Sequence, residues 1–453
     1  MAFICFRYKK IVFLLAPCNV DNSSLDVDIC ASRSLSSSSV ATHLRILRWC
    51  GYCRQARGAR PLSTCSPHSL YRAFTLALTT LYLLQELHIF LLCKVQEDMD
   101  KLARVMFLLL CHITSIAKQL VFHVKADSID EMLGGLDGKY PLYNQGLEAH
   151  QRLLRGTEAR AARFVRAYAG CAVVTCTLWI TFPVMYHLQG KPVEFPFWIN
   201  VDYNRCFRFV LVLAYSYYVT TLVGIANTTM DAFMATVLNQ CKSQLIILRM
   251  NFESLPQRAA EAVRAGSHLT YDAVLMKLFR ECLAHYEKIT KTAKMLQDIF
   301  GTAILIQFGI GGWILCMAAY KILNMLSIEF ASMTLFICCI LTELFLYCYY
   351  GNEVTDESNR VSESIYSMEW RRAGLSFQRS LVLVMERAKR PLRPAAGLVI
   401  PLSLDTFVKV CYPTLAVRCY LYNQVVASFR DAKLCTLGVK YSAGTQWIII
   451  KII

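Results

Sequence analysis

Cysteine and histidine side chains are the first candidates for chemistry in this chain, because twenty cysteines occur among its 453 residues. The sharpest pattern is Cys50-x-x-Cys53 followed by Cys65-x-x-His68, whose spacing resembles that of a small zinc site. The loop between the two pairs is short, and its arginines would repel a divalent cation. Many of the other cysteines lie in apolar segments, where cysteine behaves as a small apolar residue. We therefore expect packing cysteines and no bound metal, with zinc as the alternative.

The short motifs that mark common catalytic sites are absent from the sequence. It contains no Gly-x-Gly-x-x-Gly, no phosphate-binding glycine loop, no His-Glu-x-x-His and no Gly-x-Ser-x-Gly. We therefore expect no enzymatic activity, no catalytic residues and no cofactor. The net charge of +16 could attract nucleic acid. The lysines and arginines lie instead in loops between apolar segments, where a membrane explains them, so no nucleic-acid partner is predicted.

The composition is that of a membrane protein. Apolar residues make up 55% of the chain, charged residues only 18%, and the mean hydropathy is +0.38. A membrane-spanning helix needs about 20 mostly apolar residues. Windows of that length predict an all-α polytopic protein with a membrane domain at 70–425. Its seven predicted spans are 70–93, 102–122, 164–186, 207–226, 299–320, 328–350 and 402–425.

The distribution of basic residues predicts how the chain is oriented in the membrane. Residues 41–72 carry six arginines and no acid, whereas residues 94–101 carry three acids and two lysines. Because lysine and arginine accumulate on the cytoplasmic side, the N-terminus should be cytoplasmic and, after seven spans, the C-terminus extracellular. Residues 1–69 form the cytoplasmic N-terminal region. Within it we expect 1–40 to be an atypical extension with a disordered serine-rich stretch at 34–40, and 426–453 to be an atypical tail.

Two segments have an order of elements that identifies a family. Residues 346–409 comprise the end of an apolar span from Leu346, a polar serine-rich helix ending at Trp370, a basic apolar helix, and the break Arg390-Pro-Leu-Arg-Pro before the last span. This order resembles the C-terminal signature of insect odorant receptors. Residues 283–308 are similar to the pattern in which a cytoplasmic, histidine-centred helix runs straight into the fifth span of these receptors.

The resemblance implies a function and a set of partners. Insect odorant receptors are tuning subunits of odour-gated, non-selective cation channels, and they assemble with a shared co-receptor in the plasma membrane of sensory neuron dendrites. The partners implied are the co-receptor, membrane lipid and a small volatile ligand. An apolar ligand favours aromatic walls with a few polar groups. The candidate ligand-binding residues, taken from spans two to five, are Phe107, Trp179, Phe182, Tyr186, Tyr215, Tyr218, Trp313 and Met317.

The resemblance also implies where the pore and the subunit contacts lie. In the family, the first half of the seventh helical segment joins subunits within a cytoplasmic anchor, here about 351–390, and the second half lines the pore. The pore or gate candidates are the polar residues Ser403, Asp405, Thr406, Thr414, Asn423 and Gln424, because polar groups in a span usually face water or protein. The anchor candidates, expected to present an apolar surface and basic groups to a neighbour, are Leu381, Val384, Met385, Arg387, Ala388 and Arg390.

Two other receptor classes remain open as alternatives. An insect gustatory-type receptor channel shares the architecture and has a shorter C-terminal signature. A G-protein-coupled chemoreceptor would have its N-terminus outside and usually an Asn-Pro-x-x-Tyr motif in its seventh helix, where this chain has Cys411-Tyr-Pro-Thr. The arrangement of charges and motifs favours the odorant receptor class over both.

Overall fold

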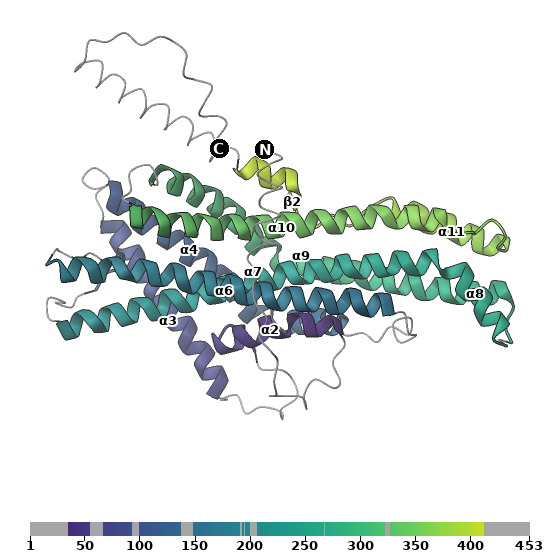
Figure 1. Cartoon of the computed structure of the whole chain (residues 1–453), viewed down its shortest axis with the longest axis horizontal. Coiled ribbons are helices and arrows are strands. Elements are labelled where there is room, and N and C mark those ends of the chain that lie inside the picture. The colour runs from purple at the N-terminus through teal and green to yellow at the C-terminus, as the bar shows by residue number, and fades with distance from the viewer. Residues whose placement is uncertain are drawn as a thin grey trace, which may run out of the picture.

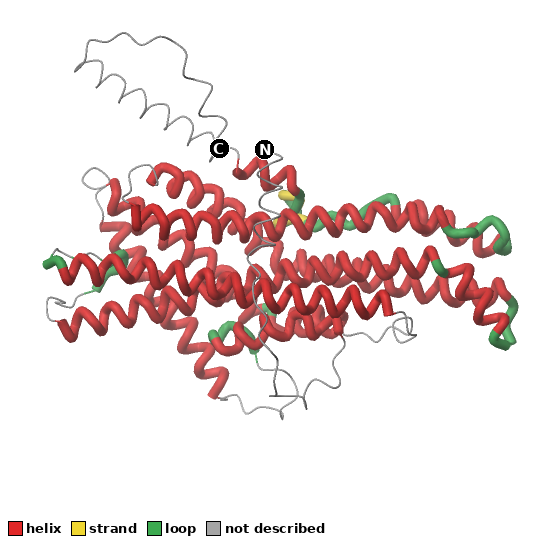
Figure 2. Tube along the Cα trace, viewed as in Figure 1, coloured by secondary structure: helices red, strands yellow, loops and turns green. Residues whose placement is uncertain are grey.

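The computed structural model describes residues 35–54, 67–92, 99–136, 148–190, 193, 195–199, 206–266, 268–321 and 327–411, and it is almost entirely helical (Figure 2). This agrees with the predicted all-α class. In the described part of the chain, the strands are β1 (Ala395–Ala396) and β2 (Ile400–Pro401), which pair antiparallel with Ala395 opposite Pro401. The helices in chain order are α2 (Leu35–Trp49), α3 (Pro67–Leu92), α4 (Met99–Val124), α5 (Ala126–Leu136), α6 (Glu148–Leu188), α7 (Cys206–Glu253), α8 (Leu255–Arg264), α9 (Tyr271–Lys321), α10 (Ser327–Ser367) and α11 (Leu375–Ala388).

Five helices of the described chain, α3, α6, α7, α9 and α10, are long and apolar enough to cross a membrane. They contain five of the seven predicted spans. The predicted span at 102–122 lies in α4, whose described apolar stretch, Leu108–Val124, is shorter. The predicted span at 402–425 begins as a helix at 404–411, and its remainder lies outside the described residues. The described chain is therefore a helical bundle with five helices that could cross a membrane.

Several helices are much longer than a membrane is thick. α7 has 48 residues and α9 has 51. At about 1.5 Å per residue each exceeds 70 Å, against a hydrocarbon core of about 30 Å. One end of α7, α9 and α10 therefore projects beyond the membrane, together with α8 and α11 at the right of Figure 1. The expected histidine-centred helix that runs into the fifth span is confirmed, because α9 is continuous through His285 and Ile299.

The centre of the bundle is α7, which packs against α6, α9 and α10. Its buried residues continue from Phe209 to Phe252, along nearly the whole helix. Ion pairs reinforce the projecting half, where Lys242 pairs with Glu353 and the Arg249 guanidinium lies 2.6 Å from the Glu357 carboxylate. These contacts hold α7 and α10 together over most of their length.

The N-terminal region differs from the sequence prediction. Residues 34–40 were expected to be disordered because they are serine-rich, but α2 begins at Leu35. Ser39 is completely buried and Val40 is 1% exposed. The His43 side chain contacts the Thr236 hydroxyl of α7 at 3.2 Å. Tertiary burial of one face of α2 against α6 and α7 therefore overrides the weak helix propensity of serine.

Glycines bring the C-terminal segment into contact with α9 and α10. The Gly397 amide donates to the Gly301 carbonyl of α9 at 2.9 Å, and Gly397 has a φ of +57° that favours glycine. On α10, a Cβ atom added to Gly351 would lie 2.4 Å from the Leu402 Cβ. The start of the last helix is thus held by backbone contacts to both long helices.

Candidate functional site

An aromatic cluster lies between α3, α7 and the segment that precedes α7. It consists of Tyr82 of α3, Phe195 and Phe197 of that segment, and Phe209 and Tyr215 of α7. Their ring centroids are 5.0 Å apart for Tyr82 and Phe197, and 5.8 Å apart for Phe197 and Tyr215. The Trp198 amide donates to the Gln85 carbonyl at 3.1 Å, which fixes the segment onto α3. The cluster is a closely packed aromatic core between α3 and α7.

Polar groups border this cluster on the side of α3 and α4. The Tyr82 ring lies 5.2 Å from the His112 ring, and His112 Nδ1 lies 2.9 Å from a carboxylate oxygen of Glu86. The Tyr215 hydroxyl donates to the side-chain carbonyl of Gln85 at 3.0 Å. Glu86 is completely buried. The aromatic cluster is therefore bordered by buried polar side chains of α3 and α4.

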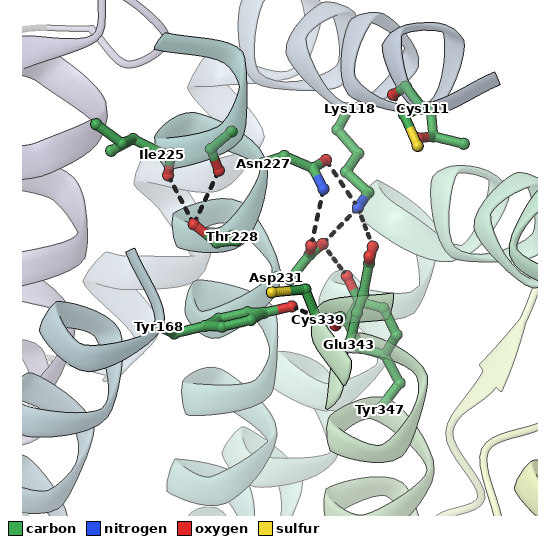
Figure 3. A network of polar contacts seen from close by, with 12 residues as sticks. Cys111, Lys118, Tyr168, Ile225, Asn227, Thr228, Asp231, Cys339, Glu343 and Tyr347 are labelled. Carbon is green, nitrogen blue, oxygen red and sulfur yellow. Dashed lines mark hydrogen bonds and ion pairs between the residues drawn. The ribbon is translucent and has the colours of Figure 1, made fainter. Parts of the chain in front are cut away.

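A second set of polar side chains, here called the ionic network, joins α4, α7 and α10 (Figure 3). The Lys118 ammonium of α4 contacts a carboxylate oxygen of Asp231 at 2.5 Å, the side-chain carbonyl of Asn227 at 3.1 Å, and the Glu343 carboxylate of α10. The Tyr347 hydroxyl donates to the same oxygen of Asp231, and the Asn227 amide donates to its other oxygen at 3.3 Å. Lys118, Asp231 and Tyr347 are completely buried. Three helices are therefore held by groups that cannot separate without exposing a charge to an apolar interior.

The last helix is connected to this network through α10. Gly351, one turn beyond Tyr347, contacts Leu402. The Phe345 ring, between Glu343 and Tyr347, packs edge-on against Phe407 with centroids 5.5 Å apart. Ser403 caps the helix at 404–411, because its hydroxyl accepts from the Thr406 amide at 3.2 Å. A displacement of α10 would therefore move the start of the last helix.

The comparison with known families identifies the architecture. The model of a family described as the 7tm odorant receptor matches residues 98–412, which include all three helices of the ionic network. The chain belongs to the odorant receptor family.

Individual relatives agree with this membership. Odorant receptor Or2 of Anopheles gambiae is 22% identical over 392 residues, covering 84% of this chain and 98% of that protein. Odorant receptor 94a of Drosophila melanogaster is 23% identical over 227 residues, and the chain spans 56% of its length. Among solved structures, the insect olfactory receptor OR5 from Machilis hrabei, in complex with eugenol, has a TM-score of 0.70 at 14% identity, over 84% of this chain and 96% of that one. It shares the fold.

The predicted ligand-binding residues of the receptor are spread over α4, α6, α7 and α9. Tyr215 belongs to the aromatic cluster. Trp179 is partly buried and its ring lies 5.9 Å from that of Phe336 of α10. Phe182 is partly buried, whereas Tyr186, Tyr218 and Trp313 are 37%, 48% and 60% exposed. The side chains of Phe107 and Met317 lie outside the described residues. The structure therefore brings Tyr215 alone of the described candidates into the aromatic cluster, and ligand contact stays a prediction.

The predicted pore residues divide into three groups. Ser403 and Thr406 form the helix cap, and the Thr406 hydroxyl also donates to the Pro401 carbonyl at 2.7 Å. Asp405 is exposed and pairs with Lys409 at 2.6 Å. Thr414, Asn423 and Gln424 lie outside the described residues. The cap gives Ser403 and Thr406 a structural role at the entrance of the seventh predicted span, in addition to any role in a pore.

The predicted anchor residues, in α11 and directly after it, differ in exposure. Leu381 and Ala388 are each 1% exposed, because they pack into the core of their own chain. This differs from the expectation that they offer an apolar surface to a neighbour. Val384 and Met385 are partly buried, and Arg387 and Arg390 are exposed. The outward face of α11 instead carries Leu375, Val382 and Leu383, which are 71%, 61% and 73% exposed.

The cysteine pattern lies partly outside the described residues, since Cys65 is not among them. Cys50 is buried in the core beside α2, and burial raises the pKa of its thiol to about 12. Cys50 therefore packs in the core of the described chain.

Sequence analysis missed the ionic network and most of the aromatic cluster. A usable signal was present, because Lys118 and Glu343 lie within predicted spans, where an ionisable residue marks a functional or structural site by default. Tyr82, Glu86 and His112 are likewise polar residues within predicted spans. The run Phe195-Pro-Phe-Trp198 lies in a loop. Its packing against α3 and α7 could be recognised only once the fold was known.

Proposed function

We propose that this receptor is the tuning subunit of a heteromeric, odour-gated, non-selective cation channel. The observation that carries the proposal is the family match over residues 98–412, which spans the ionic network and the start of the last helix. In this proposal the partner is the co-receptor of the family, and the location is the plasma membrane of olfactory sensory neurons. The ligand is a small volatile molecule. The related OR5 was solved with eugenol, a small aromatic compound, which is consistent with that class.

The proposed topology has seven spans, a cytoplasmic N-terminus and an extracellular C-terminus. Its support is the arginine-rich, acid-free stretch at 41–72 and the basic loops on the same side. In this orientation the projecting ends of α7, α9 and α10 are cytoplasmic, together with α8 and α11 (Figure 1). The aromatic cluster then lies towards the extracellular side, from which a volatile ligand arrives.

Gating in this proposal is a shift between two arrangements of the helices. An odorant that binds the aromatic cluster more tightly in the open arrangement favours that arrangement by the difference in binding free energy. The cluster contacts α7, and the ionic network joins α7 to α10. The contacts of Gly351 with Leu402 and of Phe345 with Phe407 then pass a displacement of α10 to the last helix. Each step of this route is a direct contact between neighbouring elements.

Subunit assembly in this proposal uses the outward face of α11. Leu375, Val382 and Leu383 form an exposed apolar stripe outside the proposed membrane zone. A stripe of this kind on a projecting helix indicates a protein contact. The exposed Arg387 and Arg390 lie nearby and supply basic groups for acids on the adjoining subunit.

Whole-cell current recording tests the proposed function. Cells carrying this chain with an insect co-receptor, challenged by a broad odorant panel while G-protein signalling is blocked, should show odour-evoked cation current. Cells with either subunit alone and the same surface delivery serve as the control, and this chain alone should stay silent. A response abolished by the G-protein block would exclude the channel mechanism.

A further inference from the structure

One face of α6 is exposed along the whole helix, and its chemistry changes sharply at one point. Up to residue 167 the exposed positions are Arg152, Arg155, Ala159, Arg160, Arg163, Arg166 and Ala167. From residue 170 to 185 the same face carries uncharged residues, namely Gly170, Val174, Thr177, Thr181 and Met185. These positions recur every three or four residues, so they form one stripe along the helix. The stripe is arginine-rich in its first half and uncharged in its second.

The opposite face of α6 is buried over the same length. Leu154, Ala161, Val165, Tyr168 and Ala172 are all less than 8% exposed, and α6 packs there against α2, α7 and α10. Among the five membrane-length helices, α6 has the smallest buried share in its most apolar stretch, 17%. The uncharged half of the stripe therefore faces lipid, and Val174 is 53% exposed. Since the helix is continuous, the arginine half faces the same way, towards the head-group region next to the hydrocarbon core.

The length of the uncharged half places the arginines at the membrane surface. Arg166 and Leu188 are 22 residues apart, about 33 Å of helix at about 1.5 Å per residue. The hydrocarbon core is about 30 Å thick, so Arg166 lies at one boundary when Leu188 lies at the other. Arg163 and Arg160 follow within about 9 Å below Arg166. These three guanidinium groups are therefore at the depth of the phospholipid head groups.

Their local contacts leave the charge available. The Nε atoms of Arg160, Arg163 and Arg166 each donate to the carbonyl four residues earlier, at 3.0, 3.3 and 3.0 Å. Within the described part of the chain, no carboxylate lies within ion-pair distance of these three residues. The terminal nitrogens form a fork that matches the oxygens of a phosphate. Three such forks lie at successive turns on a lipid-facing stripe.

We propose that Arg160, Arg163 and Arg166 form a binding surface for anionic phospholipid head groups of the cytoplasmic leaflet. This inference rests on the proposed orientation, in which the first half of α6 is cytoplasmic, and it assigns the receptor a lipid ligand in addition to its odorant. The positive charge selects phosphatidylserine or phosphoinositides over the zwitterionic phosphatidylcholine. Binding holds α6 at a fixed depth, and α6 packs directly on α7.

Native mass spectrometry of the full chain tests the surface without odorant, co-receptor or current, so its failure is distinguishable from failure of the proposed function. The receptor is reconstituted in vesicles of phosphatidylcholine with phosphatidylserine, extracted in detergent, and its retained lipids and subunit number are measured. Wild type should retain phosphatidylserine preferentially. The variant Arg160→Gln/Arg163→Gln/Arg166→Gln should retain about tenfold less, since each basic group contributes to the attraction.

Two further variants serve as controls. Arg371→Gln/Arg372→Gln/Arg379→Gln removes the same charge from exposed positions at the α11 end of the molecule, and it should retain lipid like wild type. Replacement of Arg160, Arg163 and Arg166 by lysine should preserve most of the retention. Equal retention by wild type and the glutamine variant would overturn the proposal, and so would an equal loss in the α11 control. A lower subunit number with unchanged lipid would identify the stripe as a protein contact instead.

Discussion

The ionic network places one basic and two acidic side chains in the buried interior of the bundle. Asp231 accepts hydrogen bonds from Lys118, Asn227 and Tyr347, whereas Glu343 accepts from Lys118. Asp231 therefore has three hydrogen-bond donors around it and Glu343 has one, so the loss of Asp231 disturbs more of the buried network.

This arrangement predicts an asymmetry between two conservative variants. Glu343→Gln keeps an acceptor oxygen for Lys118 and should destabilise the receptor by about 1 kcal/mol or less. Asp231→Asn keeps an acceptor oxygen for Lys118 and Tyr347 but places an amide donor opposite the Asn227 amide, so it should cost more. The double variant leaves Lys118 without a carboxylate and should cost about 3–5 kcal/mol. Thermal unfolding in detergent gives the order. A larger loss for Glu343→Gln than for Asp231→Asn would show that Glu343 is the more important partner of Lys118.

A buried histidine outside the predicted spans makes the docking of α2 sensitive to acid. Burial lowers the pKa of His43 from 6.5 to about 4. Above pH 6.5 the ring is neutral whether the protein is folded or unfolded, so the folded state has its full stability. Below pH 6.5 the unfolded chain takes up a proton that the folded state rejects, and stability falls as the pH approaches 4, by up to about 3 kcal/mol.

His43→Gln should remove most of this pH dependence while lowering stability somewhat at every pH, because a hydrogen bond to Thr236 is perturbed. Melting temperatures at pH 7 and pH 5 for wild type and variant measure the effect. Equal losses between the two pH values in both proteins would exclude His43 as the group responsible.

Among the helices, sequence reasoning succeeded where hydropathy decides and failed where tertiary contacts decide. The apolar stretches of α3, α6, α7, α9 and α10 were located because each must match the hydrocarbon thickness. The far end of α7 was not located, because polar residues beyond an apolar stretch neither end nor extend a helix by themselves. The far part of α9 through His285 was expected only from the family resemblance. The burial of Leu381 and Ala388 also depends on which face of α11 meets α10, which composition leaves open.

The contact between α10 and the start of the last helix should be intolerant of a single methyl group. In Gly351→Ala the new Cβ would lie 2.4 Å from the Leu402 Cβ and 2.5 Å from its carbonyl oxygen, so the backbone at Leu402 must move. We expect a loss of about 1–3 kcal/mol in stability and reduced odour-evoked current at unchanged surface expression. Gly134→Ala on α5, where a Cβ meets nothing within 4 Å, is the control. Full current from Gly351→Ala would mean that the contact does not govern the last helix.

The outward stripe of α11 predicts a defect in assembly without a defect in folding. Val382→Lys/Leu383→Lys places two charges on an exposed apolar face, so the isolated chain should keep its melting temperature. Co-purification with the co-receptor should fall several-fold, because apolar contacts at an interface are lost and charges are left unpaired there. Lysine at Ser380, a partly buried neighbour, tests whether any added charge has this effect. Unchanged co-purification would place the subunit contact elsewhere.

For the whole molecule, the membrane orientation distinguishes an odour-gated channel from a G-protein-coupled receptor. This orientation can be measured with residues at the two ends of the helical bundle. Cys206 is exposed at the start of α7, at the opposite end of that helix from α8 and the start of α9. In the proposed topology Cys206 is extracellular, and the loop before α9, which contains the exposed His268, is cytoplasmic.

An impermeant maleimide applied to intact cells should therefore modify the peptide containing Cys206. It should modify a cysteine placed at position 268 by His268→Cys only after permeabilisation. Mass spectrometry of the labelled peptides distinguishes these sites from the other cysteines, and Cys206→Ser provides the blank. The reverse pattern would place the N-terminus outside, which would remove the charge argument that supports the channel topology and the head-group position of the α6 arginines together.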